Sequence, residues 1–241
     1  EDMRASYEHG LAESVEWTTP DRYVIRIRDG IELHDGRTLD ADDVAYSFRR
    51  AVDPALGVQP ALAALLDPAG ITVLDRRTVQ VELAQPSVTF PDLLASYYLG
   101  IVPDGYSRDD PRQVGTGPFR LEHFTPGSES VHVRHEGYRQ AGRPYLDEVR
   151  IVDFSDSTAL LNALLAEQVD CIVDVPFAEA RVVEEADGVE LLESEGGTWL
   201  PITMAVDQAP FDDVRVRRAF RLIVDREEVV DRVLAGHGRI A

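Results

Sequence analysis

Histidines are the first residues to consider for chemistry, and the sequence of 241 residues contains six of them. His34 precedes Asp35, a pair also found in metal phosphohydrolases, but those enzymes need further ligands at defined places. His132 and His135 have opposite parity in a run expected to be a strand, so their side chains face opposite sides. A shared zinc site is therefore not expected.

Acidic pairs are the second candidates for catalysis. Asp42-Asp43 and Asp212-Asp213 each stand at the expected start of a helix, where the helix dipole stabilises negative charge without a catalytic role. The sequence has no Gly-x-Ser-x-Gly elbow, phosphate loop or His-Glu-x-x-His motif. We therefore predict that the chain is not an enzyme.

Glycines and the cysteine add little chemistry. Gly115 and Gly117 flank Thr116, but no strand, glycine-rich loop and helix follow in the order that nucleotide binding requires. The pair instead predicts a sharp bend. Cys171 is the only cysteine, which excludes an internal disulfide, and its apolar run 170–175 predicts a buried, unreactive thiol.

The composition excludes several classes of protein. The formal net charge is −20 and every basic residue is arginine, so binding to nucleic acid or to anionic membranes is not expected. No apolar run reaches the roughly 18 residues that a membrane-spanning helix needs. An apolar fraction of 44% is enough for a hydrophobic core.

The best-defined elements lie in residues 23–54. Tyr23, Ile25 and Ile27 alternate with arginines, and the alternation resumes after Asp29-Gly30, which predicts a hairpin. Asp40 is the expected N-cap of a helix that ends at Pro54. Its inward face is expected to carry Val44, Phe48, Ala51 and Val52.

Periodicity predicts the remaining elements. Helices are expected over 60–66, 86–98 and 177–186. Three more are expected to begin after the N-caps Ser157, Asp213 and Asp225. The helix after Ser157 is expected to carry four leucines on one stripe, namely Leu160, Leu161, Leu164 and Leu165. The helix after Asp213 is expected to turn Val216, Ala219, Phe220 and Ile223 inward. Strands are expected over 71–75, 78–83, 119–124, 131–135, 149–154, 171–175, 189–193 and 199–206. Residues 103–113 are polar and predict a connection between domains.

Four runs in order resemble one known family. They are 23–54, which reads YVIRIRDGIELHDGRTLDADDVAYSFRRAVDP, then 114–119 (VGTGPF), 137–149 (GYRQAGRPYLDEV) and 210–226 (PFDDVRVRRAFRLIVDR). Together they resemble the family 5 extracellular solute-binding proteins, the oligopeptide, dipeptide and nickel receptors of ABC importers. The resemblance implies an α/β fold of the type II periplasmic-binding-protein class, cluster C, with two lobes built on mixed sheets and present here as a partial chain.

The resemblance also implies how the chain is divided. Residues 1–13 would end a first-lobe entry segment, 14–113 would form a small second domain, 114–209 would return to the first lobe and 210–241 would begin a truncated C-terminal lobe. Gly115, Thr116 and Gly117 would then form the hinge. Relatives commonly have a glycine after the helix that begins near Ser157, where this chain has Glu167.

Candidate ligand-binding residues follow from the same resemblance. Aromatic side chains on a cleft rim supply contact area at low entropic cost, which favours Tyr97, Tyr98 and Trp199. Core packing is the alternative for Tyr97, whereas two glycines before Trp199 favour an exposed position. Asp207 would attract a cationic group if it faces the cleft, and otherwise is a turn residue.

The implied function is capture of a peptide or similar small solute between two lobes, for delivery to an ABC permease. The protein would be extracytoplasmic, periplasmic or lipid-anchored at the cell surface, and monomeric, without a cofactor or metal. Nickel chelates, oligosaccharides and opines are alternative ligands. A ligand sensor on the same fold and a hydrolase with its site outside this segment are alternative functions.

Overall fold

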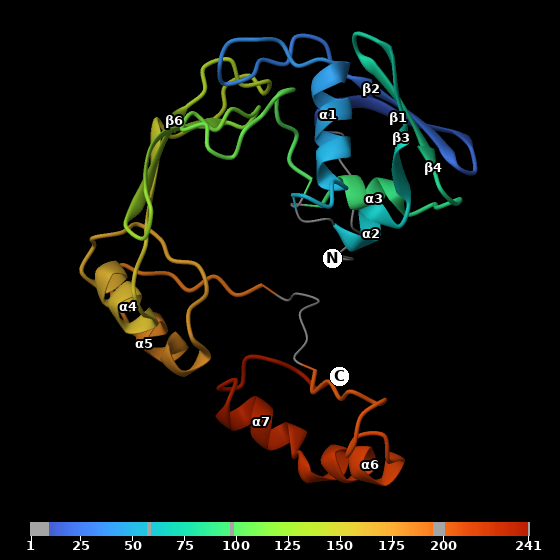
Figure 1. Cartoon of the computed structure of the whole chain (residues 1–241). Helices are drawn as coiled ribbons and strands as arrows, with labels where there is room; N and C mark the ends of the chain where they lie inside the picture. The colour runs from blue at the N-terminus through green and yellow to red at the C-terminus, as the bar shows by residue number, and fades with distance from the viewer. Residues whose placement is uncertain (1–9, 57–58, 97–98, 195–200, 241) are drawn as a thin grey trace. The chain divides into compact units, whose positions relative to one another are not determined.

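The computed structural model describes residues 10–56, 59–96, 99–194 and 201–240. Its contacts divide the chain into two compact units, residues 1–153 and residues 154–241 (Figure 1).

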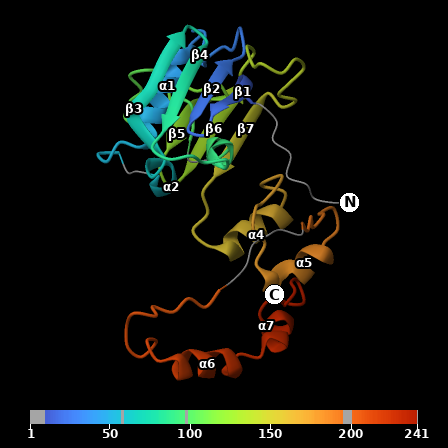
Figure 2. The same cartoon turned by 90° about the vertical axis from the view of Figure 1, so that its right-hand side faces the viewer.

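A four-stranded antiparallel sheet is the centre of the first unit, in the order β1-β2-β4-β3 (Figure 2). Its strands are β1 (Ala12–Thr19), β2 (Arg22–Ile27), β3 (Leu66–Asp75) and β4 (Thr78–Leu83). The alternation predicted for β2 is confirmed, because Tyr23, Ile25 and Ile27 are buried. The hairpin predicted for residues 71–83 is confirmed as well, although β3 begins earlier than expected.

The hairpin predicted around Asp29-Gly30 is wrong. Strand β2 already has β1 on one side and β4 on the other, so the sheet has no free edge beside β2. Residues 31–39 instead form a loop of their own, closed by Leu39 N–H donating to the Ile31 carbonyl at 2.8 Å and by a bridge between Glu32 and Thr38. This loop places His34 against residues 115–117 and the ring of His135.

Helix α1 (Ala41–Ala51) covers the four-stranded sheet (Figure 1). Asp40 is its N-cap, as predicted, and forms a capping box with Asp43. The Arg49 guanidinium donates to the Ile71 carbonyl of β3 at 2.8 Å. The expected apolar face is confirmed, and the core between helix and sheet includes Val44, Phe48, Val52, Leu33, Leu39, Val79, Val81, Leu83 and Phe90.

Two short helices complete this layer. Helix α2 (Pro60–Ala63) lies within the predicted range, and α3 (Phe90–Leu94) is much shorter than the helix predicted over 86–98. The Tyr23 hydroxyl donates to the Ser87 carbonyl at 2.7 Å, and its ring lies 5.1 Å from that of Phe90. The contacts of Tyr23 therefore hold residues 87–90 against the sheet, although the helix that follows is only about one turn long.

A second, three-stranded antiparallel sheet follows in the order β5-β6-β7 (Figure 2). Its strands are β5 (Phe119–Thr125), β6 (Glu129–Arg134) and β7 (Glu148–Val152). All three were predicted to within two or three residues. Residues 103–118 contain no helix or strand, which agrees with the polar, turn-forming composition of residues 103–113.

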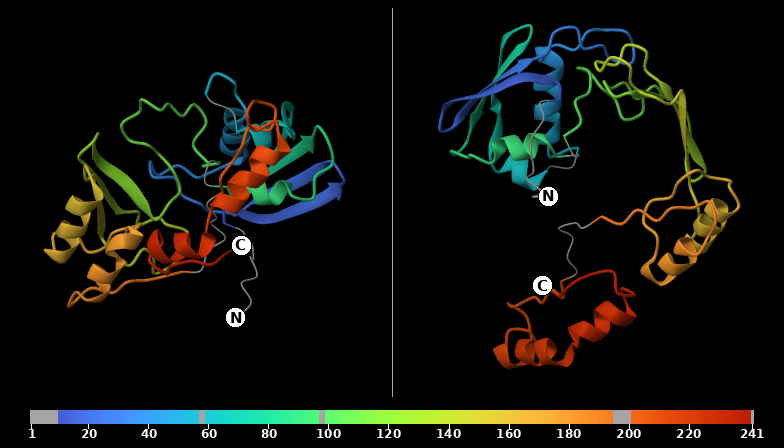
Figure 3. Two further views of the ribbon diagram at one scale, coloured as in Figure 1. Left: turned by 90° about the horizontal axis from the view of Figure 1, so that it is seen from below. Right: turned by 180° about the vertical axis from the view of Figure 1, so that it is seen from behind.

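The second unit is helical where it is described. It contains α4 (Ser157–Leu165), the 3-10 helix η1 (Phe177–Glu179), α5 (Ala180–Glu184), α6 (Val214–Ile223) and α7 (Arg226–Arg232) (Figure 3). Asp213 and Asp225 are N-caps, as predicted. The N-cap of α4 is Asp156 rather than Ser157, because its carboxylate accepts from the Ala159 N–H at 2.8 Å.

Several predictions for this unit are wrong. The strands expected over 171–175 and 189–193 are not formed, and the described part of 199–206 has no strand. Cys171 is exposed, not buried. Alternating or continuous apolar residues favour a strand only when a neighbouring strand is available, and none of the described residues of this unit provides one.

The apolar face predicted for α6 is not buried. Phe220 and Ile223 are exposed, as is Ala219, and Val216 is only half-buried. The periodicity correctly identified a helix with one apolar side. Periodicity alone does not show whether other parts of the chain cover that apolar side.

The end of α4 is a Schellman motif without glycine. Glu167 has φ of 58°, its N–H donates to the Leu164 carbonyl at 2.9 Å, and the Gln168 N–H donates to the Ala163 carbonyl at 2.8 Å. A left-handed backbone is strained for any residue with a Cβ atom. Glu167 therefore has the conformation that a glycine would adopt without strain.

We expect Glu167→Gly to stabilise α4 by about 0.5 to 1 kcal/mol, because relief of left-handed strain exceeds the entropy lost by glycine. Native-state hydrogen exchange of the α4 amides measures the change. Gln168→Gly is the matched control and should not stabilise, because Gln168 is not among the residues with positive φ. Equal effects of both changes would contradict the strain explanation.

None of the helices in the described ranges is long and apolar enough to cross a membrane.

Candidate functional site

The structure describes only one of the four predicted ligand-binding residues. Tyr97, Tyr98 and Trp199 lie outside the described residues. Asp207 is exposed in a turn, in which the Gln208 N–H donates to the Ala205 carbonyl at 3.1 Å. The structure therefore places Asp207 at the surface of the second unit, and its role in binding stays a prediction.

The predicted hinge residues 115–117, here called the crossing, are bound by His34. The His34 N–H donates to the Gly115 carbonyl at 2.9 Å, and the Gly115 N–H donates back to His34 Nδ1 at 3.2 Å. His34 Nε2 lies 3.0 Å from the Gly117 carbonyl. One residue of the 31–39 loop thus contacts both glycines of the crossing.

His135 holds the crossing from the side of the three-stranded sheet. It follows β6 directly, is only 5% exposed, and its N–H donates to the Pro118 carbonyl at 2.9 Å. Its Nδ1 lies 3.3 Å from the Gly117 carbonyl and its Nε2 lies 3.4 Å from Glu32 Oε1. The rings of His34 and His135 meet edge to face, with centroids 4.9 Å apart. The two histidines therefore connect both sheets of the unit through the crossing.

Burial lowers the pKa of His34 below its ordinary value of 6.5. The hydrogen bond to the Gly117 carbonyl and the charge of Asp35 oppose this change, whereas His135 and Arg120 add to it. Desolvation disfavours the charged imidazolium, so His34 is neutral at physiological pH.

An open depression of about 510 Å³ lies beside the two histidines. Its lining includes both negative and positive side chains. The carboxylates are those of Glu32, Glu122, Glu136 and Asp147, and the guanidinium groups are those of Arg120 and Arg134. No group of His, Cys, Asp and Glu in the described ranges is arranged to hold a metal ion. Both histidines form hydrogen bonds with backbone groups of the crossing.

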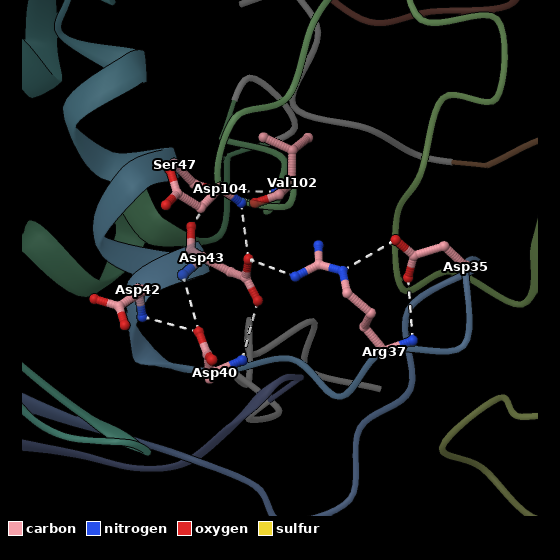
Figure 4. Close-up of polar contacts among 8 residues, drawn as sticks. All are labelled: Asp35, Arg37, Asp40, Asp42, Asp43, Ser47, Val102 and Asp104. Carbon is pink, nitrogen blue, oxygen red and sulfur yellow. Dashed lines mark hydrogen bonds and ion pairs between the residues drawn. The ribbon is translucent and has the colours of Figure 1, made fainter.

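A second set of contacts joins α1 to the segment that leads into the crossing (Figure 4). The carboxylate of Asp43 is 1% exposed and accepts from the Asp104 N–H at 2.8 Å and the Asp40 N–H at 3.1 Å. The Arg37 guanidinium lies 3.9 Å from the same carboxylate, and it also pairs with Asp35 at 3.1 Å. Asp43 thus binds backbone groups from two separate segments.

The same side of α1 makes further contacts with residues 102–106. The Ser47 hydroxyl accepts from the Val102 N–H at 2.9 Å, and the Tyr46 hydroxyl donates to the Tyr106 carbonyl at 3.0 Å. The Arg50 guanidinium stacks over the Tyr106 ring at 4.9 Å. These contacts come from a polar stripe at helical spacing, formed by residues 43, 46, 47 and 50. The spacing of these polar residues is a sequence signal for a second contact face of the helix, which an analysis of apolar residues alone does not detect.

The first unit is an α/β structure in which the chain passes from a four-stranded sheet to a three-stranded sheet through the crossing. Residues 6–241 match the family model of bacterial extracellular solute-binding proteins, family 5 Middle. The chain belongs to this family, as the four sequence runs indicated.

Two curated relatives show the extent of the similarity. Heme-binding protein A of Haemophilus influenzae is 29% identical over 263 residues, covering 97% of this chain and 48% of that protein. Glutathione-binding protein GsiB of Escherichia coli K12 is 27% identical over 244 residues, covering 98% of this chain and 47% of that protein. The chain spans about half the length of the curated relatives it matches.

A solved structure agrees with this assignment. The periplasmic binding protein AgaA of A. tumefaciens R10, in complex with agropinic acid, is 30% identical with a TM-score of 0.81, covering 94% of this chain and 47% of that one. The fold expected from the sequence, that of the family 5 periplasmic binding proteins, is confirmed.

Proposed function

We propose that the full-length protein is the extracytoplasmic solute-binding component of an ABC importer, which captures a peptide or similar small solute between two lobes and delivers it to a membrane permease. The match of residues 6–241 to the family 5 model supports this proposal most strongly. The family is described as extracellular, and the relatives named above are binding proteins rather than enzymes.

The proposed division of the chain follows the two sheets. Residues 14–113 would form the small second domain, since nearly all of the four-stranded sheet and helices α1 to α3 lie in that range. Residues 114–209 would return to the first lobe, 210–241 would begin the C-terminal lobe, and 1–13 would end the entry segment. Residues 115–117, between the two sheets, would be the hinge.

The proposed ligand is peptide-like. One relative is named for glutathione, a small peptide, and others for heme and agropinic acid, so related proteins take chemically different solutes. Peptide capture in a cleft depends mainly on hydrogen bonds to the main chain, with aromatic contacts at the rim. We propose that Tyr97, Tyr98 and Trp199 supply those contacts and that Asp207 attracts a cationic group, with nickel chelates, oligosaccharides and opines as alternative ligands.

Thermal unfolding of the full-length protein with a library of peptides, amino-acid chelates, opines and oligosaccharides tests the ligand class. A solute present at 100 times its Kd should stabilise the protein by about 2.7 kcal/mol. Stabilisation by peptides supports the proposal. A folded protein that binds another class and no peptide would overturn the ligand assignment, and uptake that is unchanged in a deletion strain would favour the sensor function.

Trp199→Ala tests the proposed rim, and the other tryptophan provides the control. Loss of one aromatic contact worth about 1.4 kcal/mol weakens binding roughly tenfold. Trp17→Ala removes a half-exposed indole that stacks on Tyr23 in the four-stranded sheet, 6.2 Å between centroids, and should leave the Kd unchanged. Calorimetry with the identified solute decides, and equal Kd values for both variants would contradict the role of Trp199.

A further inference from the structure

His34 contacts the crossing in a way that only one form of its side chain allows. Nδ1 faces the Gly115 N–H at 3.2 Å and must accept, whereas Nε2 faces the Gly117 carbonyl at 3.0 Å and must donate. The neutral tautomer with its hydrogen on Nε2 satisfies both contacts. The other neutral tautomer satisfies neither, and the imidazolium satisfies only the second.

Protonation of Nδ1 would bring two N–H groups together. The Gly115 N–H would lose its acceptor, and a partly buried backbone donor without a partner is unfavourable. The crossing would keep the bond between the His34 N–H and the Gly115 carbonyl at 2.9 Å. It would lose the side-chain contact that fixes the direction of the Gly115 amide.

Charged and titratable groups around His34 come from three segments. Asp35 lies in its own loop together with Glu32, Arg120 lies on β5, and His135 follows β6. Asp35 favours the imidazolium, whereas Arg120 and His135 disfavour it, and Glu32 faces His135 at 3.4 Å. The ring of His135 belongs to the same hydrogen-bond network as His34, because both side chains contact the Gly117 carbonyl.

We propose that His34 is a positioning residue that fixes the Gly115 amide of the crossing only in its neutral form, so that acidification frees this amide while the other two contacts between His34 and the crossing remain. The crossing is the connection between the two sheets of the first unit. The inference concerns this connection alone and does not depend on which solute the protein binds.

The direction of the pH effect follows from the lowered pKa of His34. Above the unfolded pKa of about 6.5, both the folded and unfolded states are neutral at this residue and the contact is complete. Between that value and the lower folded pKa, the unfolded state binds more protons, so stability falls as the pH falls. The contribution of His34 is lost once the pH passes below the folded pKa.

Nuclear magnetic resonance of the full chain tests the proposal in two ways. The ring nitrogen shifts of His34 should show hydrogen on Nε2 and none on Nδ1 at pH 7.5. The exchange rate of the Gly115 amide, corrected for its intrinsic pH dependence, should rise at least tenfold as His34 becomes protonated. Hydrogen on Nδ1 at pH 7.5, or exchange that does not follow the titration, would overturn the proposal.

Substitutions separate the titration from the packing. His34→Asn keeps an acceptor near the position of Nδ1 and cannot be protonated, so the Gly115 amide should stay protected at all pH values between 5 and 7.5. His123→Asn is the matched control, because His123 is exposed on β5, contacts Thr125 and should leave the pH dependence intact. Unchanged pH dependence in His34→Asn would assign the effect to another group and reject His34.

Discussion

Replacing Asp43 by alanine should lower the free energy of unfolding of the first unit by about 2 to 4 kcal/mol, because each partly buried N–H left without an acceptor costs about 1 to 3 kcal/mol. The change removes the acceptor of the Asp104 N–H and the Asp40 N–H together. Asp43→Asn keeps one carbonyl acceptor and should cost less. Urea unfolding, followed by hydrogen exchange of core amides in β2 and β4, measures both values.

Asp42 provides the matched control for this measurement. It is the neighbouring aspartate in the first turn of α1 and is exposed. Surface substitutions of this kind usually change stability by less than about 0.5 kcal/mol. If Asp42→Ala destabilised the unit as much as Asp43→Ala, the loss would reflect the helix dipole rather than the buried carboxylate. The bonds to residues 40 and 104 would then not be the cause.

Phe90→Ala should cost about 3 to 5 kcal/mol, the usual range for removing a buried phenylalanine side chain. Phe90 is 0% exposed and packs against Tyr23, and it lies in α3, which has only five residues. Because a helix this short is not stable by itself, the loss of the Phe90 ring should also release the segment around Ser87 from the sheet. Hydrogen exchange of that segment should increase together with the loss of stability.

Phe124→Ala is the same chemical change at an exposed site. Phe124 lies on β5 and is 58% exposed, so its removal creates no cavity. We expect a cost below about 1 kcal/mol, which reflects strand propensity alone. Comparable losses at positions 90 and 124 would show that the Phe90 pocket closes after truncation. The segment around Ser87 would then keep its protection.

Local signals predicted the elements of the first unit well. The N-cap, acidic first turn and apolar face of helix α1 lie within the helix or directly beside it, so no distant contact is needed to identify it. Strands β2 and β4 alternate clearly. The hairpin prediction fails in the 31–39 loop because Ile31 and Leu33 alternate and are both buried as in a strand, yet neither lies in a sheet.

Distant contacts set the limit for the candidate site. The glycines of the crossing correctly indicated a bend, but its contact with His34 joins residues that are 81 positions apart in the sequence. No periodicity reports such a contact. Metal binding is a common role of histidine and was the hypothesis considered for His34 and His135. In the structure, both side chains form hydrogen bonds with backbone groups of the crossing.

The two buried sides of α1 make its length unusually constrained. A residue inserted after Tyr46 would rotate the second half of the helix by about 100° relative to the first. Phe48 would leave the sheet at the same time as Ser47 and Arg50 left the 102–106 segment, and no single compensating substitution restores both. Insertions and deletions among homologues should therefore avoid this helix and occur in the turn that follows Pro54.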